Sequence, residues 1–179
     1  MDSMRIIIVI FFTSLSFVAH SYGDLIDDVC QKTIDYNLCV KSLRADPRSA
    51  SADKKSLARI IIQLSQDKAN DILSQTEMLL KQTKEPVLKQ CLEVCKEMYD
   101  TAVFHYSEAV NYLDADNFSD AADTAGETLS DADTCDESFT EPTPVLKSPL
   151  KPKTDDFFHF ADLTLSLLNQ FKSLKTPFH

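Results

Sequence analysis

The five cysteines are the residues of this 179-residue chain whose chemistry is most readily interpreted. Cysteines can pair as disulfides in an oxidising compartment or, at suitable spacing, bind zinc. Cys91 and Cys95 are four residues apart, but no second pair of Cys or His has ligand spacing, so we expect no metal site. An odd number leaves at least one thiol unpaired within the chain. The five are Cys30, Cys39, Cys91, Cys95 and Cys135.

No combination of histidine, serine and acidic residues has the spacing of a known catalytic motif. His105 lies alone beside an apolar helical stripe, which is typical of a boundary residue. Gly23 and Gly126 are the only glycines, and this excludes glycine-rich phosphate loops. One acidic stretch resembles a calcium loop, but Phe118 and Ala125 occupy positions that need oxygen ligands. We therefore expect no catalytic residue, no cofactor and no metal.

The N-terminal stretch 1–23 has the composition of a secretory signal peptide. Arg5 supplies a positive charge, and the apolar run 6–18 is shorter than the roughly 20 residues needed to span a bilayer. Small residues allow cleavage after Ser21 or Gly23. We expect the mature chain to leave the cell or to reach a compartment fed by secretion, where cysteines pair.

The charge of the chain restricts its partners. With 18 basic and 28 acidic residues, its formal net charge is −10, which disfavours nucleic acids and anionic membranes as partners. One stretch holds nine acidic residues and no Lys or Arg. Such a run is either a solvated face or a surface that steers a basic partner. The nine are Asp114, Asp116, Asp120, Asp123, Glu127, Asp131, Asp133, Asp136 and Glu137.

Helical periodicity marks four long segments, and no segment shows the alternation of a strand. Short or moderate connections between them predict an all-α fold, an antiparallel four-helix bundle over 53–179, present as a monomer. The four segments are 53–82, 86–113, 119–139 and one that begins near Thr154 or Asp155. Four prolines before the last segment predict a non-helical connection there; they are Pro142, Pro144, Pro149 and Pro152.

The stretch 24–52 holds too few apolar residues to bury itself alone. Two short helices folded back as a hairpin, closed by a disulfide between Cys30 and Cys39, would fit its pattern. We therefore expect one domain, 24–179, in which this stapled hairpin and its connection precede the bundle.

Helix register favours one partner for Cys135. In an antiparallel pair, residues at equal height lie symmetrically about the turn. Cys95 and Cys135 are centred on residue 115, inside the predicted turn, whereas Cys91 and Cys135 are centred on residue 113, inside the predicted helix. The difference is about 5 Å along the axis, enough to decide a disulfide. The register predicts a Cys95–Cys135 bond and leaves Cys91 as a free, buried thiol.

Four motifs in order resemble the plant invertase and pectin methylesterase inhibitor family. They are C-x8-C at 30–39, R-A-D-P-R-S at 44–49, C-x3-Y-x2-A at 95–102 and T-C-D-E-S-F at 134–139. The resemblance covers essentially the whole mature chain. It implies a secreted inhibitor rather than an enzyme, located in the cell wall (apoplast) or the vacuole. It also implies disulfides Cys30–Cys39 and Cys95–Cys135, and Cys91 departs from the four-cysteine pattern.

The family's two branches block different hydrolases, pectin methylesterase or acid invertase. Invertase inhibitors often carry Pro-Lys-Phe between the second and third bundle helices, where this chain has Asp-Asn-Phe at 116–118. Acidic residues there would be repelled by the carboxylates that cleave glycosides, so we predict pectin methylesterase as the target and acid invertase as the alternative. The candidate target-binding residues are Asp114, Asp116, Phe118, Asp120 and Asp123.

The predicted turn also contains the only N-x-[S/T] sequon, Asn117-Phe118-Ser119. In a secreted protein this sequence is an acceptor for an N-linked glycan, and a turn would expose it. A glycan on Asn117 would cover the turn and be a further obstacle to binding invertase.

Overall fold

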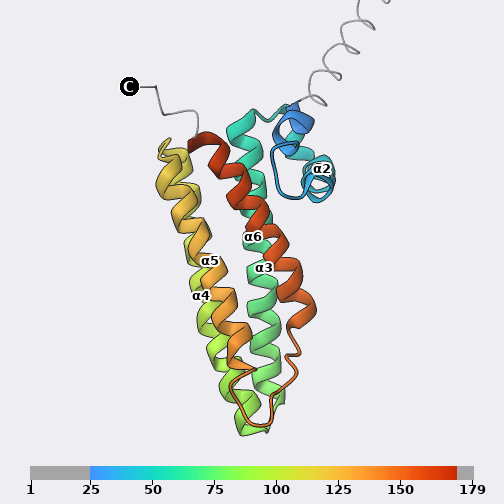
Figure 1. Ribbon diagram of the computed structural model, residues 1–179, viewed down its shortest axis with the longest axis vertical. Coiled ribbons are helices and arrows are strands. Elements are labelled where there is room, and N and C mark those ends of the chain that lie inside the picture. The colour runs from blue at the N-terminus through green and yellow to red at the C-terminus, as the bar shows by residue number, and fades with distance from the viewer. Residues whose placement is uncertain (1–24, 173–179) are drawn as a thin grey trace, which may run out of the picture.

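The computed structural model describes residues 25–172, which are helical in every regular element and contain no strand. Four long helices run antiparallel to one another (Figure 1). α3 contacts α4, α4 contacts α5, α5 contacts α6 and α6 returns to α3, so the four helices enclose one core. They are α3 (Lys54–Gln82), α4 (Pro86–Asp114), α5 (Phe118–Ser138) and α6 (Lys151–Lys172). The predicted four-helix bundle is therefore confirmed, and the predicted signal peptide, 1–23, lies outside the described residues.

A small hairpin precedes the bundle and lies at its upper end in Figure 1. Residues 25–30 are helical, α2 (Tyr36–Ala45) follows, and a short 3-10 helix, η1 (Pro47–Ser51), leads into α3. A disulfide joins Cys30 to Cys39 with the Cα atoms 5.6 Å apart. The hairpin thus has the stapled form that the sequence predicts.

Apolar side chains fix the hairpin against the bundle. Leu43 of α2 is fully buried in a cluster with Leu57 and Ile61 of α3 and with Leu163 and Leu167 of α6. On each bundle helix these residues are four apart, so each helix presents one apolar side to the hairpin. Burying one side chain of this size stabilises the fold by about 1.5–3 kcal/mol.

The bundle core combines small residues on α5 with large ones on α4 and α6. The alanines of α5 let α4 approach closely, and Tyr99, Tyr106 and Phe157 fill the space between α4 and α6. Tyr99 and Phe157 meet edge to face with ring centroids 5.3 Å apart. The buried alanines of α5 are Ala121, Ala122, Ala125 and Ala132.

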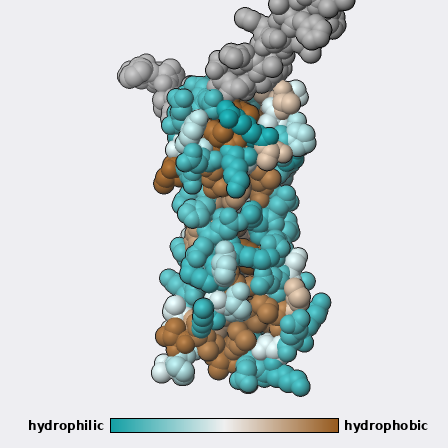
Figure 2. Space-filling model, turned by 90° about the vertical axis from the view of Figure 1, so that its right-hand side faces the viewer, coloured by the Kyte–Doolittle hydropathy of each residue, from teal (hydrophilic) through white to brown (hydrophobic). Residues whose placement is uncertain are grey.

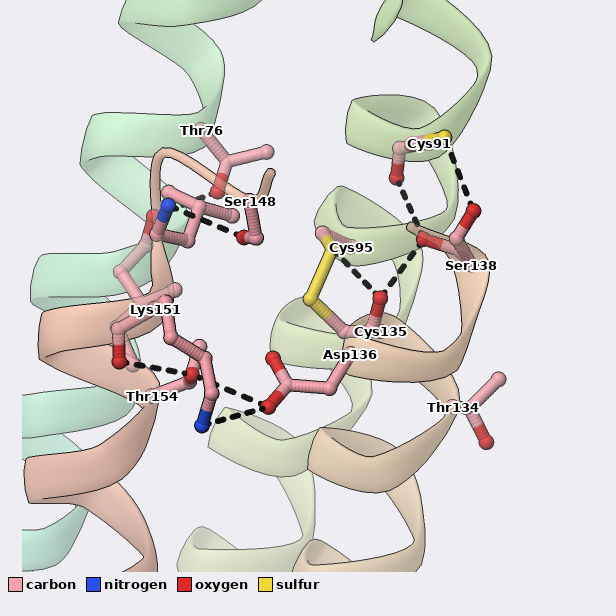
Figure 3. Close-up of a disulfide and its surroundings, with 12 residues drawn as sticks. Thr76, Cys91, Cys95, Thr134, Cys135, Asp136, Ser138, Ser148, Lys151 and Thr154 are labelled. Carbon is pink, nitrogen blue, oxygen red and sulfur yellow. Dashed lines mark hydrogen bonds and ion pairs between the residues drawn. A yellow bond between two sulfur atoms is a disulfide. The ribbon is translucent and has the colours of Figure 1, made fainter. Parts of the chain in front are cut away.

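A second disulfide joins Cys95 of α4 to Cys135 of α5 with a Cα separation of 4.4 Å, as the helix register predicts. Figure 3 shows this bond with Cys91 one turn away on α4, beside Ser138 of α5. The Cys91 thiol donates a hydrogen bond to the Ser138 carbonyl oxygen at 3.0 Å and remains unbonded to sulfur. The structure thus contains both predicted disulfides.

Two helix starts differ from the sequence prediction. α6 begins at Lys151, three residues before Thr154, because Pro152 falls in its first turn, where a missing amide hydrogen costs nothing. The prediction that Pro152 belongs to a non-helical connection is therefore wrong. α5 begins at Phe118, one residue earlier than expected, because Asn117 caps the helix.

Candidate functional site

Backbone hydrogen bonds fix the turn between α4 and α5. The Asp116 amide donates to the Leu113 carbonyl at 3.1 Å, and the Asn117 amide donates to the Tyr112 carbonyl at 2.9 Å. These two bonds form a Schellman motif, which requires a left-handed residue, and Asp116 has a φ of 58°. Aspartate is among the few L-residues that adopt this conformation at modest cost. The turn therefore has one defined shape.

The two carboxylates of this turn are paired with cations of α3. Asp114 forms an ion pair with Arg59, and the Lys55 Nζ lies 2.6 Å from Asp116 Oδ1 and 3.1 Å from the Asp114 carbonyl oxygen. Arg59 and Lys55 therefore compensate these carboxylates within the chain, which reduces the repulsion from an invertase site that the sequence suggests.

Phe118 also packs against another residue of the chain. Its half-buried ring stacks on Phe171 of α6, with centroids 4.9 Å apart and ring planes at 20°. The pair closes the upper end of the bundle between α5 and α6. A partner can contact the exposed edge of Phe118, but it could not take up the whole ring without separating this stack.

The acidic residues at the start of α5 form hydrogen bonds or ion pairs with other residues of the chain. The Asn117 side chain accepts from the Asp120 amide at 3.5 Å and donates to the Asp120 carboxylate at 2.5 Å. Asp123 accepts from the Lys172 Nζ at 2.6 Å. The structure therefore brings all five candidate residues to one exposed end, but each already has a contact within the chain.

A second acidic surface lies on the outward side of α4 and α5, and we call it the outer face. We define it by four exposed residues, Glu97, Asp100 and Phe104 of α4 and Glu127 of α5. Glu127 is near Asp131, which contacts His105 next to Phe104, so the two helices share this surface. Residues three and four apart share one side of a helix, which places the three α4 residues together. Phe104 is 60% exposed. Within residues 25–172, the carboxylates of Glu97, Asp100 and Glu127 form no ion pair.

One polar pair links the two helices beside this outer face. His105 Nδ1 lies 2.9 Å from Asp131 Oδ2, and the His105 ring also contacts the ring of Phe104. Burial raises the pKa of the Asp131 carboxyl, the hydrogen bond from His105 opposes this rise, and nearby Glu127 adds to it. Asp131 is therefore a helix-to-helix contact rather than a free charge.

The sequence analysis does not identify the outer face, because its candidate residues come from the acidic run at the start of α5, whereas the exposed aromatic residue lies on α4. The sequence does contain a signal for Phe104. This residue falls outside the apolar stripe and has acidic residues four positions away on each side, Asp100 and Glu108. A large apolar residue that falls outside the buried stripe and between charges is predicted to be exposed rather than to join the core.

The opposite end of the bundle is apolar and grooved. Figure 2 shows hydrophobic side chains gathered at the lower end of the molecule, where α3 ends, α4 begins and the proline-rich connection lies. Met78, Val87 and Val145 are exposed there, at 52%, 48% and 66%. A groove of about 600 Å³ runs between the start of α4 and the connection, and Cys91 and Leu146 are among its lining residues.

The Cys91 thiol in this groove is poorly placed for reaction. Cys91 is only 3% exposed, and burial raises the pKa of its thiol above the usual value. Because the thiolate is the reactive form, both features keep this sulfur inert. Cys91 therefore serves as a small apolar residue that also donates to Ser138.

The described part of the chain offers neither a metal centre nor a membrane span. Among residues 25–172, no group of three or more His, Cys, Asp or Glu side chains has a metal-binding arrangement. Over the same residues, no helix is both long enough and apolar enough to cross a membrane.

Comparisons with known proteins agree on one family. The profile described as "Plant invertase/pectin methylesterase inhibitor" matches residues 24–167. A "Pectinesterase inhibitor" of Actinidia deliciosa is 32% identical over 141 residues, 79% of this chain and 71% of its own length. A "Cell wall / vacuolar inhibitor of fructosidase 1" of Arabidopsis thaliana is 41% identical over 81 residues, 45% of this chain and 38% of its own.

A solved structure shares the fold. The crystal structure of a mutant form of a pectin methylesterase inhibitor from Arabidopsis superposes with a TM-score of 0.66 at 20% identity, covering 79% of this chain and 93% of that one. The profile match spans most of the chain, and the Actinidia relative exceeds 30% identity over most of both proteins. This chain is therefore a member of the plant invertase/pectin methylesterase inhibitor family, whose members are enzyme inhibitors and not catalysts.

Proposed function

We propose that this protein inhibits pectin methylesterase by forming a one-to-one complex. The observation that carries the proposal is the likeness to the Actinidia pectinesterase inhibitor across 79% of this chain. Both disulfides and the four-helix core are compatible with an inhibitor that docks as a rigid body. A one-to-one complex needs only one copy of this chain, so a monomer is sufficient for inhibition.

The outer face is the surface that we assign to this docking. An exposed aromatic ring offers apolar contact area, and the free carboxylates of Glu97, Asp100 and Glu127 attract a basic partner. The sequence-predicted set at the turn, Asp114, Asp116, Phe118, Asp120 and Asp123, remains a prediction. Three of its carboxylates are paired with cations of the chain and Phe118 is stacked on Phe171, so we prefer the outer face as the contact. The overall negative charge also disfavours binding to pectin, which is itself a polyanion.

Inhibition of acid invertase is the second candidate. The Arabidopsis fructosidase inhibitor is 41% identical over nearly half of this chain. In addition, Lys55 and Arg59 remove the negative charge that would repel an invertase site from the Asp114–Asp116 turn. The structure therefore weakens the electrostatic objection to invertase that the sequence alone suggests.

We further propose that the protein acts outside the cell, in the plant cell wall, with the vacuole as the alternative. The signal-like composition of 1–23 supports secretion, and two disulfides suit an oxidising compartment. The names of the Arabidopsis relatives place those proteins in the cell wall or the vacuole.

A parallel titration tests the target. Purified mature protein, with any glycan removed, is added in increasing amounts to a pectin methylesterase and to an acid invertase, and residual activity is recorded at wall pH. We expect pectin methylesterase activity to fall to its minimum at one equivalent of inhibitor. Invertase inhibition without an effect on pectin methylesterase would replace the first target with the second. Inhibition of neither would leave the family membership intact and refute both proposed functions.

A further inference from the structure

The side chain of Asn117 is exposed at the tip of the bundle, and its amide nitrogen donates one hydrogen bond of a possible two. Asn117 caps α5 from a non-helical conformation, with φ −90° and ψ 72°. Its oxygen accepts from the Asp120 amide, and its nitrogen donates one hydrogen bond, to the Asp120 carboxylate. A primary amide nitrogen carries two hydrogens, so the cap leaves one of them free.

We propose that Asn117 carries an N-linked glycan, attached in place of this free amide hydrogen, and that the helix cap persists beneath it. The donor is a polyprenyl-diphosphate oligosaccharide of the secretory pathway. The amide nitrogen forms a bond to the anomeric carbon, the bond from that carbon to the diphosphate oxygen breaks, and the displaced proton passes to a base of the transferase. The remaining amide hydrogen still donates to Asp120.

The rest of the sequon is available to a transferase. Ser119 is exposed, and its hydroxyl makes only a 3.5 Å contact with the Asp123 carboxylate. Both residues of this contact are exposed, so losing the hydroxyl should change the stability of the fold little. Removing the hydroxyl therefore provides a test that leaves the cap of α5 untouched.

A glycan on Asn117 would cover the turn between α4 and α5 and leave the outer face uncovered. It would cover the Asp114–Asp116 turn, whose backbone is already fixed and whose charges are already paired. Phe104 lies ten residues before Asp114, about 15 Å along α4. The outer face thus lies away from the attachment point. This second part rests on the proposed function, because it assumes that the outer face binds the target.

The experiment measures the mass of the whole protein purified from plant cells. Wild type, Ser119→Ala and Asn117→Asp are compared before and after treatment with a peptide-N-glycosidase active on plant glycans. We expect wild type to lose the mass of one oligosaccharide and to yield aspartate at position 117. Both variants should show the bare polypeptide mass, because one lacks the sequon hydroxyl and the other the acceptor amide. The Asn117→Asp variant keeps its helix cap, since aspartate caps a helix about as well as asparagine does.

Two results would overturn the proposal. Wild type without any oligosaccharide would refute the modification, and an oligosaccharide that persists on Ser119→Ala would place it elsewhere. Activity then tests the second part separately. We expect glycosylated wild type and Ser119→Ala to inhibit pectin methylesterase equally, whereas weaker inhibition by the glycosylated form would refute an uncovered docking face. If neither form inhibits, the proposed function fails while the mass result stands.

Discussion

The two ends of the bundle differ in polarity and in how their connections are held. At the upper end a short turn is held by backbone hydrogen bonds, by ion pairs from α3 and by a stack of two aromatic rings. At the lower end a long proline-rich connection leaves an apolar groove and exposed side chains such as Val87 and Val145. A four-helix core evidently tolerates either solution, so the ends can diverge while the core is retained.

Among the described residues, unpaired surface charge lies between the two ends rather than at the upper end. At the upper end, Asp114, Asp116 and Asp123 are each paired with a cation of the same chain, which reduces the negative charge that a second protein meets. Between the two ends, the outer face keeps carboxylates that have no ion pair among residues 25–172, together with an exposed ring. The number of acidic residues in a segment is therefore a poor guide to the charge that a partner meets.

The two disulfides should produce the largest measurable difference between the ends. Replacing Cys95 and Cys135 by alanine should lower the free energy of unfolding by about 4 kcal/mol, and replacing Cys30 and Cys39 by about 3 kcal/mol, because the first bond closes the longer loop. Urea unfolding without reductant measures both. Cys91→Ala is the matched control, since its thiol closes no loop; a larger loss from the hairpin bond would contradict this order.

Aromatic truncation should separate the upper end from the outer face. Phe118→Ala removes half of a stacked, half-buried pair and should cost about 2 kcal/mol, below the 3–5 kcal/mol typical of a fully buried ring. Phe104→Ala removes a ring that is 60% exposed and should cost at most about 0.5 kcal/mol. Thermal or urea unfolding of the two variants decides the matter, and equal losses would show that Phe104 is part of the packed structure.

Asp116 should matter more than other exposed acidic residues of this region. Asp116→Ala places alanine in a left-handed conformation and removes the ion pair with Lys55, at a cost of about 1–2 kcal/mol. Asp116→Gly should recover part of this loss, because glycine adopts a positive φ freely. Asp133→Ala, an exposed site with helical neighbours, serves as control. No difference between the alanine and glycine variants would show that the backbone of the turn is not under constraint.

The smallest expected effect is a difference in the sign of pH dependence between two aspartates. Near the hairpin, the bond from Arg48 holds the pKa of Asp46 below its usual value, so its stabilisation is present above about pH 4 and is lost as the pH falls further. Burial raises the pKa of Asp131 instead. The folded state then binds its proton more tightly, and stability falls as the pH rises from about 4 through the folded pKa.

Asparagine variants separate these two contributions. Between about pH 3 and pH 6, the stability advantage of wild type over Asp46→Asn should grow, whereas its advantage over Asp131→Asn should shrink. Urea unfolding across this range supplies both curves. Parallel curves for the two variants would contradict the opposite pKa directions. The effects are a few tenths of a kcal/mol for Asp46, whose partner Arg48 is half exposed.

The sequence predicted the fold because the features that determine it are periodic or covalent. Apolar spacing located the helices, and the midpoint of Cys95 and Cys135 fixed the register of α4 against α5. The start of α6 was missed, since Pro152 is compatible with both a connection and a first helical turn. The pairing of Lys55 with Asp116, 61 residues apart, was also missed, because no local pattern records which helices lie side by side.

A binding titration of pectin methylesterase distinguishes the outer face from the turn as the surface that engages the target. Wild type, Asp100→Lys with Phe104→Ala, and Asp116→Asn are compared by their dissociation constants at low salt. We expect the outer-face variant to bind about tenfold or more weakly, a loss of about 1.4 kcal/mol or more, and Asp116→Asn to bind like wild type. Unchanged binding by the outer-face variant with a loss in Asp116→Asn would contradict the claim and return the binding site to the turn.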